Sequence, residues 1–382
     1  MEKLKFPDGF LWGSATSAYQ VEGGIENNDW SQAARQGKVP AAGRACDHYN
    51  LYESDFEIAK SLGQNAHRFS IEWARIEPEE GKFDEEAIEH YRQVIGALLE
   101  RGLEPFVTLW HFTLPIWFAQ KGGFENPEAP KIFARYCQHV VNELGDSVKF
   151  WVTINEPMVY ATNSYWRGQW PPFGKSFFRF IKVVGNLIRS HNIGYEKIKE
   201  VSALAQIGVA KNNIYFESGH NPIYQPLSTL LAWFWNHRFL NRISQNFIGL
   251  NYYFHRRFPR NKNREVSDMG WEIFPEGIFH VLRELKKYGK PIYITENGLA
   301  DSKDLKREKF IKDHLGWVWR AIQDDIDVRG YFYWSLLDNF EWAHGFEPRF
   351  GLVEIDYQTM ARKIRPSAFE YAQICENNSL IF

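Results

Sequence analysis

Residues 150–157, FWVTINEP, give the clearest strand signal of the chain, because a run of β-branched and aromatic residues ends there in an Asn-Glu pair. A short apolar run bounded by polar residues predicts a buried β-strand. Seven more runs of this kind occur along the chain, separated by longer stretches with helical periodicity. The eight predicted strands begin near Phe10, Ala66, Pro105, Phe150, Gln206, Phe247, Pro291 and Tyr331. The clearest helices are predicted at 84–101, 130–144, 177–200, 275–288 and 307–323.

Eight strand-and-helix units predict an α/β fold built as a single (β/α)8 TIM barrel. Strands that are apolar throughout indicate a parallel sheet covered on its outer face, and eight strands close such a sheet into a barrel. A length of 382 residues also allows two or three domains, but no Pro/Ser-rich linker divides the chain, so one domain over 1–382 is expected. A doubly wound open sheet would need a Gly-rich phosphate-binding turn after its first strand, and the sequence has neither GxGxxG nor a P-loop.

Charge and composition exclude several function classes. The chain has 45 basic and 47 acidic residues, so no field of one sign attracts nucleic acid or an anionic membrane surface. Its apolar runs fall short of the roughly 20 residues that a membrane-spanning helix needs. Cys46, Cys137 and Cys375 are far apart and odd in number, which argues against a disulfide framework or a zinc site and favours a reducing, cytoplasmic location. Pro7 precedes any long apolar run, so no signal peptide is expected.

Polar and aromatic residues follow seven of the eight predicted strands. In a barrel, the loops after the strand ends form one mouth that carries the catalytic groups. These positions hold Gln20 and Glu22, Arg68, Trp110 and His111, Asn155 and Glu156, Asn251 and Tyr253, Glu296 and Asn297, and Trp334. The exit of the fifth strand, Lys211-Asn212-Asn213, is interpreted as chemically bland. Aromatic residues make up 16% of the chain, more than core packing usually requires, so some rings are expected to face a ligand.

Two carboxylates stand out, since Glu156 ends the fourth predicted strand and Glu296 ends the seventh. A charge at the end of an apolar strand must face the mouth or be buried at a heavy cost. Strands three apart in an eight-strand ring lie on facing walls, so both carboxylates could reach one bond from opposite sides. Cleavage of a glycosidic bond needs such a pair, with one proton donor and one nucleophile or base.

Seven motifs occur in a fixed order along the chain. The first is FPDGFLWGSATSAYQVEG at 6–23. It is followed by HRFSIEW (67–73), TLWHF (108–112), TINEP (153–157), GLNYY (249–253), ITENG (294–298) and YWSLLDNFEW (333–342). In content and order these motifs resemble glycoside hydrolase family 1, the β-glucosidase family, and the resemblance spans almost the whole chain.

The resemblance implies a retaining exo-β-glycosidase that acts on β-D-glucosides, with β-galactoside and β-fucoside activity and with no metal or cofactor. Glu296 is then the nucleophile and Glu156 the general acid that later serves as base, with carboxyl groups roughly 5 to 5.5 Å apart. Arg68 and Tyr253 are expected beside Glu296 to keep it ionised, with Asn251 in a supporting position. Substrate-binding roles are implied for Gln20, His111, Asn155, Tyr253, Glu341 and Trp342, with Trp334 as the platform under the sugar ring.

The expected partner is a small-molecule β-glycoside or a short oligosaccharide, and the oligomeric state stays open. Alternatives are a transglycosylating β-glycosidase, a 6-phospho-β-glycosidase and a non-enzymatic carbohydrate-binding barrel. Glu341 argues against a phosphorylated sugar, because that branch of the family has a small hydroxyl residue here and a lysine downstream, and a carboxylate repels phosphate. The basic segment 256–264, RRFPRNKNR, could favour anionic substrates but is interpreted as a solvated loop.

Compared with the family, the chain is expected to be shortened between Leu240 and Phe247 and between Tyr253 and Asp268. Both places lie next to the sixth predicted strand, at the side of the mouth where the aglycone would bind. Trimmed loops there predict a more open mouth that accepts varied or longer aglycones but binds each of them more weakly.

Overall fold

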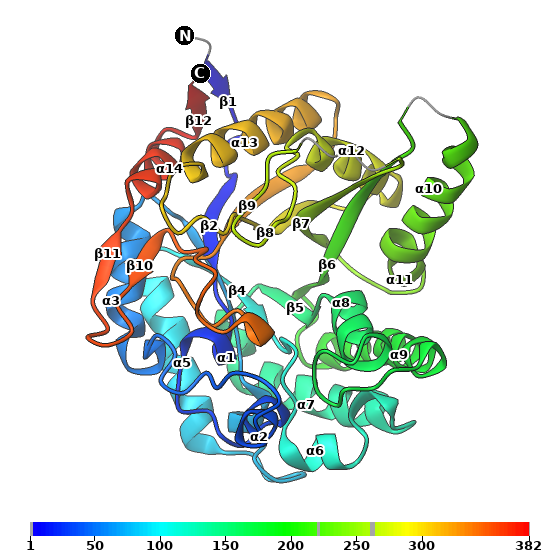
Figure 1. The fold of residues 1–382 in the computed structure, drawn as a ribbon. Helices are drawn as coiled ribbons and strands as arrows, with labels where there is room; N and C mark the ends of the chain where they lie inside the picture. Colours follow the sequence, from blue (N-terminus) through cyan, green and yellow to red (C-terminus); the bar gives the residue numbers. More distant parts are fainter. Residues whose placement is uncertain (1–2, 220–221, 260–263, 382) are drawn as a thin grey trace.

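The computed structural model describes residues 3–219, 222–259 and 264–381 and has a closed barrel of eight parallel strands at its centre (Figure 1). Neighbouring strands pair in chain order, and the first strand of the ring also pairs with the last. The barrel strands are β2 (Leu11–Ala15), β3 (Ala66–Ser70), β4 (Glu104–Thr108), β5 (Phe150–Asn155), β6 (Gln206–Glu217), β7 (Ile248–Arg257), β8 (Ile292–Asn297) and β9 (Val328–Trp334). The predicted (β/α)8 barrel is confirmed, with all eight predicted strands.

The long helices surround the barrel on its outer face (Figure 1). The α-helices of the described residues are α1 (Ala18–Val21), α2 (Asp29–Arg35), α3 (His48–Ser61), α4 (Trp73–Ile76), α5 (Glu85–Glu100), α6 (Ile116–Gln120), α7 (Ala129–Leu144), α8 (Pro157–Ala161), α9 (Phe177–Val201), α10 (Gln225–Ala232), α11 (Arg238–Leu240), α12 (Glu276–Leu285), α13 (Arg307–Gln323) and α14 (Pro366–Asn377). Short helical turns are η1 (Gly123–Glu125), η2 (Gly145–Ser147), η3 (Thr162–Trp166), η4 (Pro222–Tyr224), η5 (Trp233–His237), η6 (Lys286–Tyr288) and η7 (Trp342–His344). The five helices predicted most clearly correspond to α5, α7, α9, α12 with η6, and α13.

Local sequence explains where the long helices begin. The Asp84 side chain accepts hydrogen bonds from the backbone N–H groups of Glu86 and Ala87, which caps the N-terminus of α5. The Ser176 hydroxyl accepts from the N–H of Arg179 at the start of α9. Both helices turn an apolar face toward the barrel, since their buried residues recur at three- and four-residue spacing.

Aromatic rings fill the barrel interior below the mouth. They are Phe106, Phe150, Phe247, Tyr293 and Phe332. The rings of Phe106 and Phe150 stack with centroids 4.2 Å apart and an angle of 9° between their planes. A TIM barrel is a packed core rather than a pore, so part of the aromatic content noted in the sequence belongs to this core and forms the floor of the mouth.

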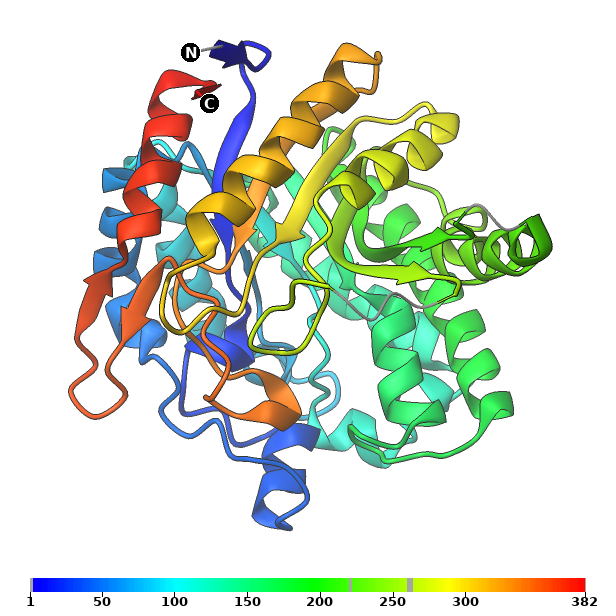
Figure 2. The same ribbon diagram turned by 45° about the horizontal axis from the view of Figure 1, so that its top comes forward.

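Two small antiparallel sheets lie outside the barrel. β1 (Lys3–Lys5) pairs with β12 (Ser379–Ile381), so the two ends of the described chain lie side by side (Figure 2). β10 (Val353–Ile355) pairs with β11 (Arg362–Ile364) between β9 and α14. The second sheet is placed next to the segment that follows β9 into the mouth.

The sixth barrel strand, β7, is longer than its apolar run indicates. β6 and β7 continue beyond the barrel as a paired ribbon, in register from Ile214 opposite Phe254 to Glu217 opposite Arg257. The interpretation of 256–264 as a loop is therefore wrong at its start, because Arg256 and Arg257 belong to β7 and pair with β6. Residues 260–263 of this segment lie outside the described residues.

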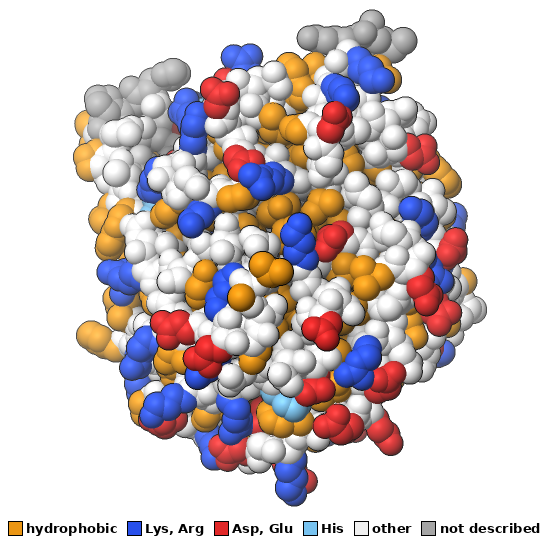
Figure 3. All heavy atoms as spheres, turned by 180° about the vertical axis from the view of Figure 1, so that it is seen from behind, with side chains coloured by type: hydrophobic (Ala, Val, Ile, Leu, Met, Phe, Trp, Pro, Cys, Tyr) orange, Lys and Arg blue, Asp and Glu red, His pale blue; other side chains and the backbone are white. Residues whose placement is uncertain are grey.

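Surface charges of both signs are mixed. Figure 3 shows the face turned away from the viewer of Figure 1, where Lys and Arg side chains alternate with Asp and Glu side chains. This mixture agrees with the near balance of charge in the sequence. Among the described residues, helices long and apolar enough to span a lipid bilayer are absent.

Candidate active site

A cavity of about 520 Å³ opens at the carboxyl ends of the barrel strands. Nine residues predicted for the site line it, namely Gln20, His111, Asn155, Glu156, Tyr253, Glu296, Trp334, Glu341 and Trp342. The two residues predicted to support them, Arg68 and Asn251, are buried behind its wall. The fold therefore brings together the residues to which the sequence assigned roles in the site, whereas Glu22, Trp110 and Asn297, which also follow predicted strand ends, do not line the cavity.

Glu296 is held by a cation and a phenol. It lies near the end of β8, with only 4% of the residue exposed. Arg68 Nη1 donates to Glu296 Oε1 at 2.5 Å, and the Tyr253 hydroxyl donates to Glu296 Oε2 at 2.9 Å. Both contacts favour the ionised carboxylate and fix its orientation.

Glu156 adopts a backbone conformation that is uncommon for a side-chain-bearing residue. Its φ of 42° lies in the left-handed region, directly before Pro157 starts α8. Its backbone N–H donates to the carbonyl oxygen of Ala210 on β6 at 2.8 Å. The side chain accepts a hydrogen bond from Asn251 Nδ2 at 2.9 Å. Strain of this kind is concentrated at functional sites, where the surrounding structure holds it in place.

Asn251 connects the two carboxyl-bearing strands. It lies on β7 in register with Glu296 and donates to Glu156. Its Oδ1 accepts from the Thr295 hydroxyl at 2.7 Å, and Thr295 directly precedes Glu296. One amide side chain thus fixes the position of both carboxyl groups, in agreement with its predicted supporting place.

The two glutamates hold protons with different strength. Burial raises the pKa of Glu156 to about 8, and the negative charge of Glu296 is the second cause. Burial also raises the pKa of Glu296, but the Arg68 guanidinium and the Tyr253 hydroxyl oppose this rise. Because the cation and the phenol contact Glu296, it loses its proton before Glu156 does. These contacts favour the proton on Glu156 rather than on Glu296.

His111 is a neutral donor. Burial lowers its pKa well below the usual range, with the charge of Arg68 as the second cause. Asn155 Oδ1 accepts from Arg68 Nη2 at 2.7 Å, so its amide group points toward His111 Nε2, at 3.0 Å. A neutral ring that accepts at Nε2 carries its proton on Nδ1. That Nδ1 is buried without a protein partner.

Gln20 and Glu341 form a polar edge of the cavity. Gln20 Nε2 donates to Asn339 Oδ1 at 3.0 Å and to the Phe340 carbonyl at 2.8 Å, which fixes the amide. Burial raises the pKa of Glu341 to about 8, and the charges of Glu296 and Glu156 add to this rise. Three carboxyl groups therefore converge on one cavity.

Aromatic rings form the other edge of the cavity. Trp334 and Trp342 are 4% and 5% exposed, and both lie close to His111. Each of their rings is nearly parallel to the imidazole, with centroids 6.0 Å away. Flat apolar surface beside directional polar groups suits a pyranose ring, which has C–H groups on its faces and hydroxyls at its rim.

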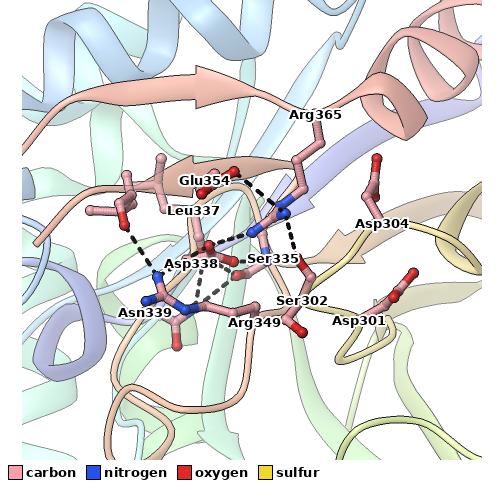
Figure 4. Close-up of polar contacts among 12 residues, drawn as sticks. Asp301, Ser302, Asp304, Ser335, Leu337, Asp338, Asn339, Arg349, Glu354 and Arg365 are labelled. Atoms are coloured by element: carbon pink, nitrogen blue, oxygen red, sulfur yellow. Dashed lines mark hydrogen bonds and ion pairs between the residues drawn. The ribbon is translucent and has the colours of Figure 1, made fainter.

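A buried carboxylate anchors the segment that carries Glu341 (Figure 4). Asp338 Oδ2 accepts from Arg365 Nη2 at 2.7 Å and from Arg349 Nη1 at 3.4 Å. Asp338 Oδ1 accepts from the N–H of Gly351 at 2.8 Å. These bonds connect the segment after β9 to α14 and to the small β10–β11 sheet, and they hold its polar side chains at the mouth.

The sequence interpretation missed the exit of the fifth barrel strand, β6. Lys211, Asn212 and Asn213 are buried there within the extended strand, so the interpretation as chemically bland is wrong. Asn212 lines the cavity, and its Nδ2 has no protein partner. Trp235, from η5, lies beside it as part of the cavity wall. A Lys-Asn-Asn run is typical of a solvated loop. The aromatic cluster at 233–235 was the one signal that could have indicated that this part of the chain lines a cavity.

The eight-stranded barrel brings two buried carboxyl groups of unequal proton affinity into one cavity, beside aromatic rings. This arrangement defines a glycoside hydrolase. The family follows from comparison with known proteins. The chain belongs to glycosyl hydrolase family 1, whose model matches residues 2–226 and 233–380. The resemblance drawn from the seven motifs is therefore confirmed, and the protein is an enzyme of this family.

The relatives are β-glycosidases. β-Glucosidase A from Thermotoga maritima is 36% identical over 444 aligned positions that cover 100% of both chains. A β-glycosidase from Pyrococcus horikoshii has a structure with a TM-score of 0.93, is 41% identical, and covers 100% of this chain and 97% of its own. The T. maritima β-glucosidase in complex with galacto-hydroximolactam has a TM-score of 0.94 at 35% identity, with 99% and 100% coverage. Since the first alignment is longer than this chain of 382 residues, that relative has segments that the present chain lacks.

Proposed function

We propose that the chain, as one catalytic domain over 1–382, is a retaining exo-β-glycosidase. Its substrates are β-D-glucosides, with β-galactosides and β-fucosides as further substrates. The observation that carries the proposal is the unequal environment of the two carboxyl groups in one cavity. Glu296 contacts Arg68 and Tyr253, whereas Glu156 accepts from the neutral amide of Asn251. Such a pair supplies an ionised nucleophile and a protonated acid at the same pH.

In the first step, a Glu296 oxygen attacks the anomeric carbon while Glu156 gives its proton to the glycosidic oxygen. The bond from the anomeric carbon to that oxygen breaks, the aglycone leaves as an alcohol, and a glycosyl ester forms on Glu296. Glu156 is then ionised. Because esterification removes the negative charge of Glu296, the pKa of Glu156 falls at the moment when it must act as a base.

In the second step, Glu156 takes a proton from a water molecule, whose oxygen attacks the anomeric carbon. The ester bond to Glu296 breaks, the sugar leaves with its original anomeric configuration, and both carboxyl groups return to their starting protonation states. If an alcohol enters in place of water, the same step builds a new glycoside. A transglycosylating enzyme therefore remains the alternative, and product analysis with an added acceptor sugar distinguishes the two.

We assign the sugar ring to the inner part of the cavity. Hydrogen bonds to its hydroxyls are assigned to Gln20, His111, Asn155, Tyr253, Glu341 and Trp342, and the stacking platform to Trp334. Asn155, fixed by Arg68, is assigned to the 2-hydroxyl, where a contact that strengthens in the transition state contributes to rate. The 6-phospho-β-glycosidase is a weaker alternative, because Glu341 occupies the position where that branch of the family has a small hydroxyl residue.

We further infer a reducing, cytoplasmic location and a relaxed aglycone preference. Cys46, Cys137 and Cys375 are each buried as free thiols, which suits a reducing compartment. The aglycone preference rests on the expected shortening beside the sixth strand. A relaxed preference predicts hydrolysis of cello-oligosaccharides as well as of short aryl glucosides. An enzyme that does not hydrolyse cello-oligosaccharides contradicts this inference.

The test of the proposal is kinetics on a panel of nitrophenyl β-glycosides with Glu296→Gly and Glu156→Ala beside the parent. Both variants should lose most activity. Azide should rescue Glu296→Gly and give the glycosyl azide of inverted configuration, because azide takes the place of the missing carboxylate. Undiminished activity in either variant refutes the assignment, and sugar binding without turnover in the parent favours the carbohydrate-binding barrel.

A further inference from the structure

Gln20 and Asn339 follow two neighbouring strands of the barrel. Gln20 lies in α1, which comes after β2, and Asn339 lies in the segment after β9. The two strands pair in the ring, and Ala15 lies opposite Trp334 where both of them end. Beyond this point, the Phe340 N–H donates to the backbone carbonyl oxygen of Gln20 at 3.2 Å. The main chain therefore holds the two segments together.

Backbone carbonyl oxygens fix the orientation of both amide side chains. Such an oxygen can only accept a hydrogen bond, so the nitrogen of an amide must face it. The Phe340 carbonyl oxygen lies 2.8 Å from Gln20 Nε2. The Leu337 carbonyl oxygen lies 3.0 Å from Asn339 Nδ2. The other end of the Asn339 amide, its Oδ1, then faces Gln20 Nε2 at 3.0 Å, so the two orientations agree.

The amide of Gln20 has one hydrogen-bonding position left. Its nitrogen carries two hydrogens, and Asn339 Oδ1 and the Phe340 carbonyl oxygen accept them. Its oxygen accepts from the Ser17 hydroxyl at 2.6 Å and has a second lone pair. Gln20 is buried and lines the cavity. A ligand hydroxyl that bonds to this amide must therefore donate to Gln20 Oε1.

Asn339 acts on the cavity only through Gln20. It is buried and does not itself line the cavity. Its Nδ2 donates to the Ser335 hydroxyl at 2.7 Å and to the Leu337 carbonyl oxygen, which holds the amide in place without a ligand. If Asn339 Oδ1 were removed, one N–H of Gln20 would be buried without an acceptor, which is costly. The Gln20 amide would then gain by turning to find another acceptor.

We propose that Asn339 is a positioning residue that makes Gln20 an acceptor for one hydroxyl of the bound sugar. The inference rests on the proposed function, because it takes the ligand to be a glycoside. Asn339 and the Phe340 carbonyl hold the nitrogen of Gln20, which leaves the oxygen for the sugar. At this place the site selects a hydroxyl group, since a hydrogen or a fluorine atom there cannot donate.

The test uses p-nitrophenyl β-glucoside and its 3-deoxy, 4-deoxy and 6-deoxy analogues. Comparison of kcat/KM for the parent and Gln20→Ala identifies the hydroxyl that Gln20 contacts, because its removal lowers kcat/KM in the parent but not in the variant. Asn339→Ala should then lower kcat/KM for the full glucoside about 5- to 50-fold more than for the analogue without that hydroxyl. A variant that is merely loosened lowers both by the same factor.

The deoxyfluoro analogue at the same position tests the direction of the hydrogen bond. Fluorine can accept but cannot donate, and its inductive effect on the reaction cancels when two enzymes are compared on one substrate. If Gln20 accepts, Asn339→Ala should affect the fluoro analogue as it affects the deoxy analogue. A fluoro analogue that responds like the full glucoside shows that Gln20 donates, and this result overturns the proposal.

Asn186→Ala is the matched control. Asn186 on α9 is also a buried amide, and its Nδ2 donates to the carbonyl oxygens of Phe124 at 2.7 Å and Asn126 at 3.1 Å. It does not line the cavity. The change should lower Tm and leave the ratios of kcat/KM among the substrates as in the parent. If Asn339→Ala does not fold, Asn339→Leu removes the same oxygen and keeps the space filled.

Equal losses on the full glucoside and its deoxy analogue in Asn339→Ala or Asn339→Leu overturn the proposal. Hydroxyl dependence that is the same in Gln20→Ala as in the parent also overturns it. Failure of the proposed function appears elsewhere, as a parent that does not hydrolyse glucosides or as undiminished activity in Glu296→Gly. If the parent hydrolyses glucosides and depends on their hydroxyls, but the Asn339 variants keep that dependence, only the role of Asn339 is wrong.

Discussion

Glu156 and Glu296 are the same amino acid, and both are buried at the ends of barrel strands. Their difference comes from what each carboxyl contacts. A guanidinium and a phenol hydroxyl donate to Glu296, whereas an amide donates to Glu156. In a site of low polarity, such contacts decide which group holds the proton. The contacts of each carboxyl group therefore determine which glutamate acts as nucleophile and which as acid in the proposed mechanism.

Tyr253→Phe should weaken the nucleophile. The variant loses the 2.9 Å hydrogen bond to Glu296 Oε2. Since a hydrogen bond to a charged group contributes about 1.5–3 kcal/mol, kcat/KM should fall about 10- to 100-fold, and its acid limb should move to higher pH. Tyr252→Phe is the matched control, because the Tyr252 hydroxyl donates to the Phe274 carbonyl instead. Equal losses in both variants contradict the assigned contact.

Glu156→Gln should stabilise the free protein at alkaline pH. The folded-state pKa of Glu156, about 8, is above its ordinary value of 4.5. Between these values the unfolded chain releases a proton that the folded chain keeps, so the contribution of Glu156 to stability falls as pH rises. The Tm of the variant should match the parent at pH 4 and exceed it by about 2–4 °C at pH 9.

The exposed Glu354 provides the control for this prediction. Its side chain is 46% exposed, so Glu354→Gln should give a Tm difference from the parent that changes little between the two pH values. A Tm difference for Glu156→Gln that is equal at pH 4 and pH 9 contradicts the raised pKa.

At the scale of elements, the site depends on segments that extend beyond the strands. The segment after β9 carries Glu341 and Trp342 and is tied down by Asp338 (Figure 4). The extended β6–β7 ribbon adds Asn212 and Phe254 to the cavity wall. Strand ends position the two carboxyl groups, and these added segments shape the space around the sugar.

Asp338→Asn should loosen the segment after β9. The change removes the nearer charged partner of the buried Arg365 guanidinium and leaves only the Glu354 carboxylate 3.7 Å away, which is a costly arrangement. Because Glu341 is proposed to bind the sugar rather than to react, KM on p-nitrophenyl β-glucoside should rise about 10-fold, more than kcat falls. Glu354→Gln, which removes a distant 3.7 Å partner of Arg365, should change neither value. A fall in kcat at constant KM contradicts the prediction.

At the scale of the whole molecule, the two ends of the chain close the fold away from the mouth. β1 pairs with β12, and Asn378 joins them to the barrel. Asn378 Oδ1 accepts from Trp12 Nε1 at 2.9 Å, and its Nδ2 donates to the carbonyl oxygens of Phe6 and Pro7. With a φ of 47°, it also ends α14 in the left-handed conformation that asparagine tolerates.

Asn378→Ala should lower stability and spare activity. It removes these side-chain hydrogen bonds and places alanine in a strained backbone conformation, at a combined cost of about 2–4 kcal/mol. Urea unfolding should show the loss, whereas kcat/KM at 25 °C should stay within twofold of the parent. Asn377→Ala, at an exposed neighbouring position with one bond to the Gln373 carbonyl, should be nearly neutral. A large drop in kcat/KM for Asn378→Ala contradicts the prediction that Asn378 stabilises the fold without affecting the active site.

Strand positions and the polar residues at the strand ends could be predicted because they follow local rules, whereas Glu341 and Trp342 were predicted from the family resemblance. An apolar run that ends in a carboxylate, as at Glu156 and Glu296, has few solutions other than a strand ending at a functional mouth. The start of the segment at 256–264 and the exit at Lys211 were interpreted wrongly for a common reason. Polar residues indicate solvent when only their neighbours in sequence are known, and here Arg256, Arg257 and Lys211 belong to the paired strands β6 and β7.

The amino-acid order by itself determined the barrel, its eight strands and the two carboxyl groups, since periodicity and the cost of burying charge act over a few residues. Tertiary structure alone decided which charges meet. Arg68 on β3 reaches Glu296 on β8 across the barrel, and Asn251 on β7 donates to Glu156 after β5. Proton affinity depends on distance and burial in three dimensions, and these become defined only when the ring closes.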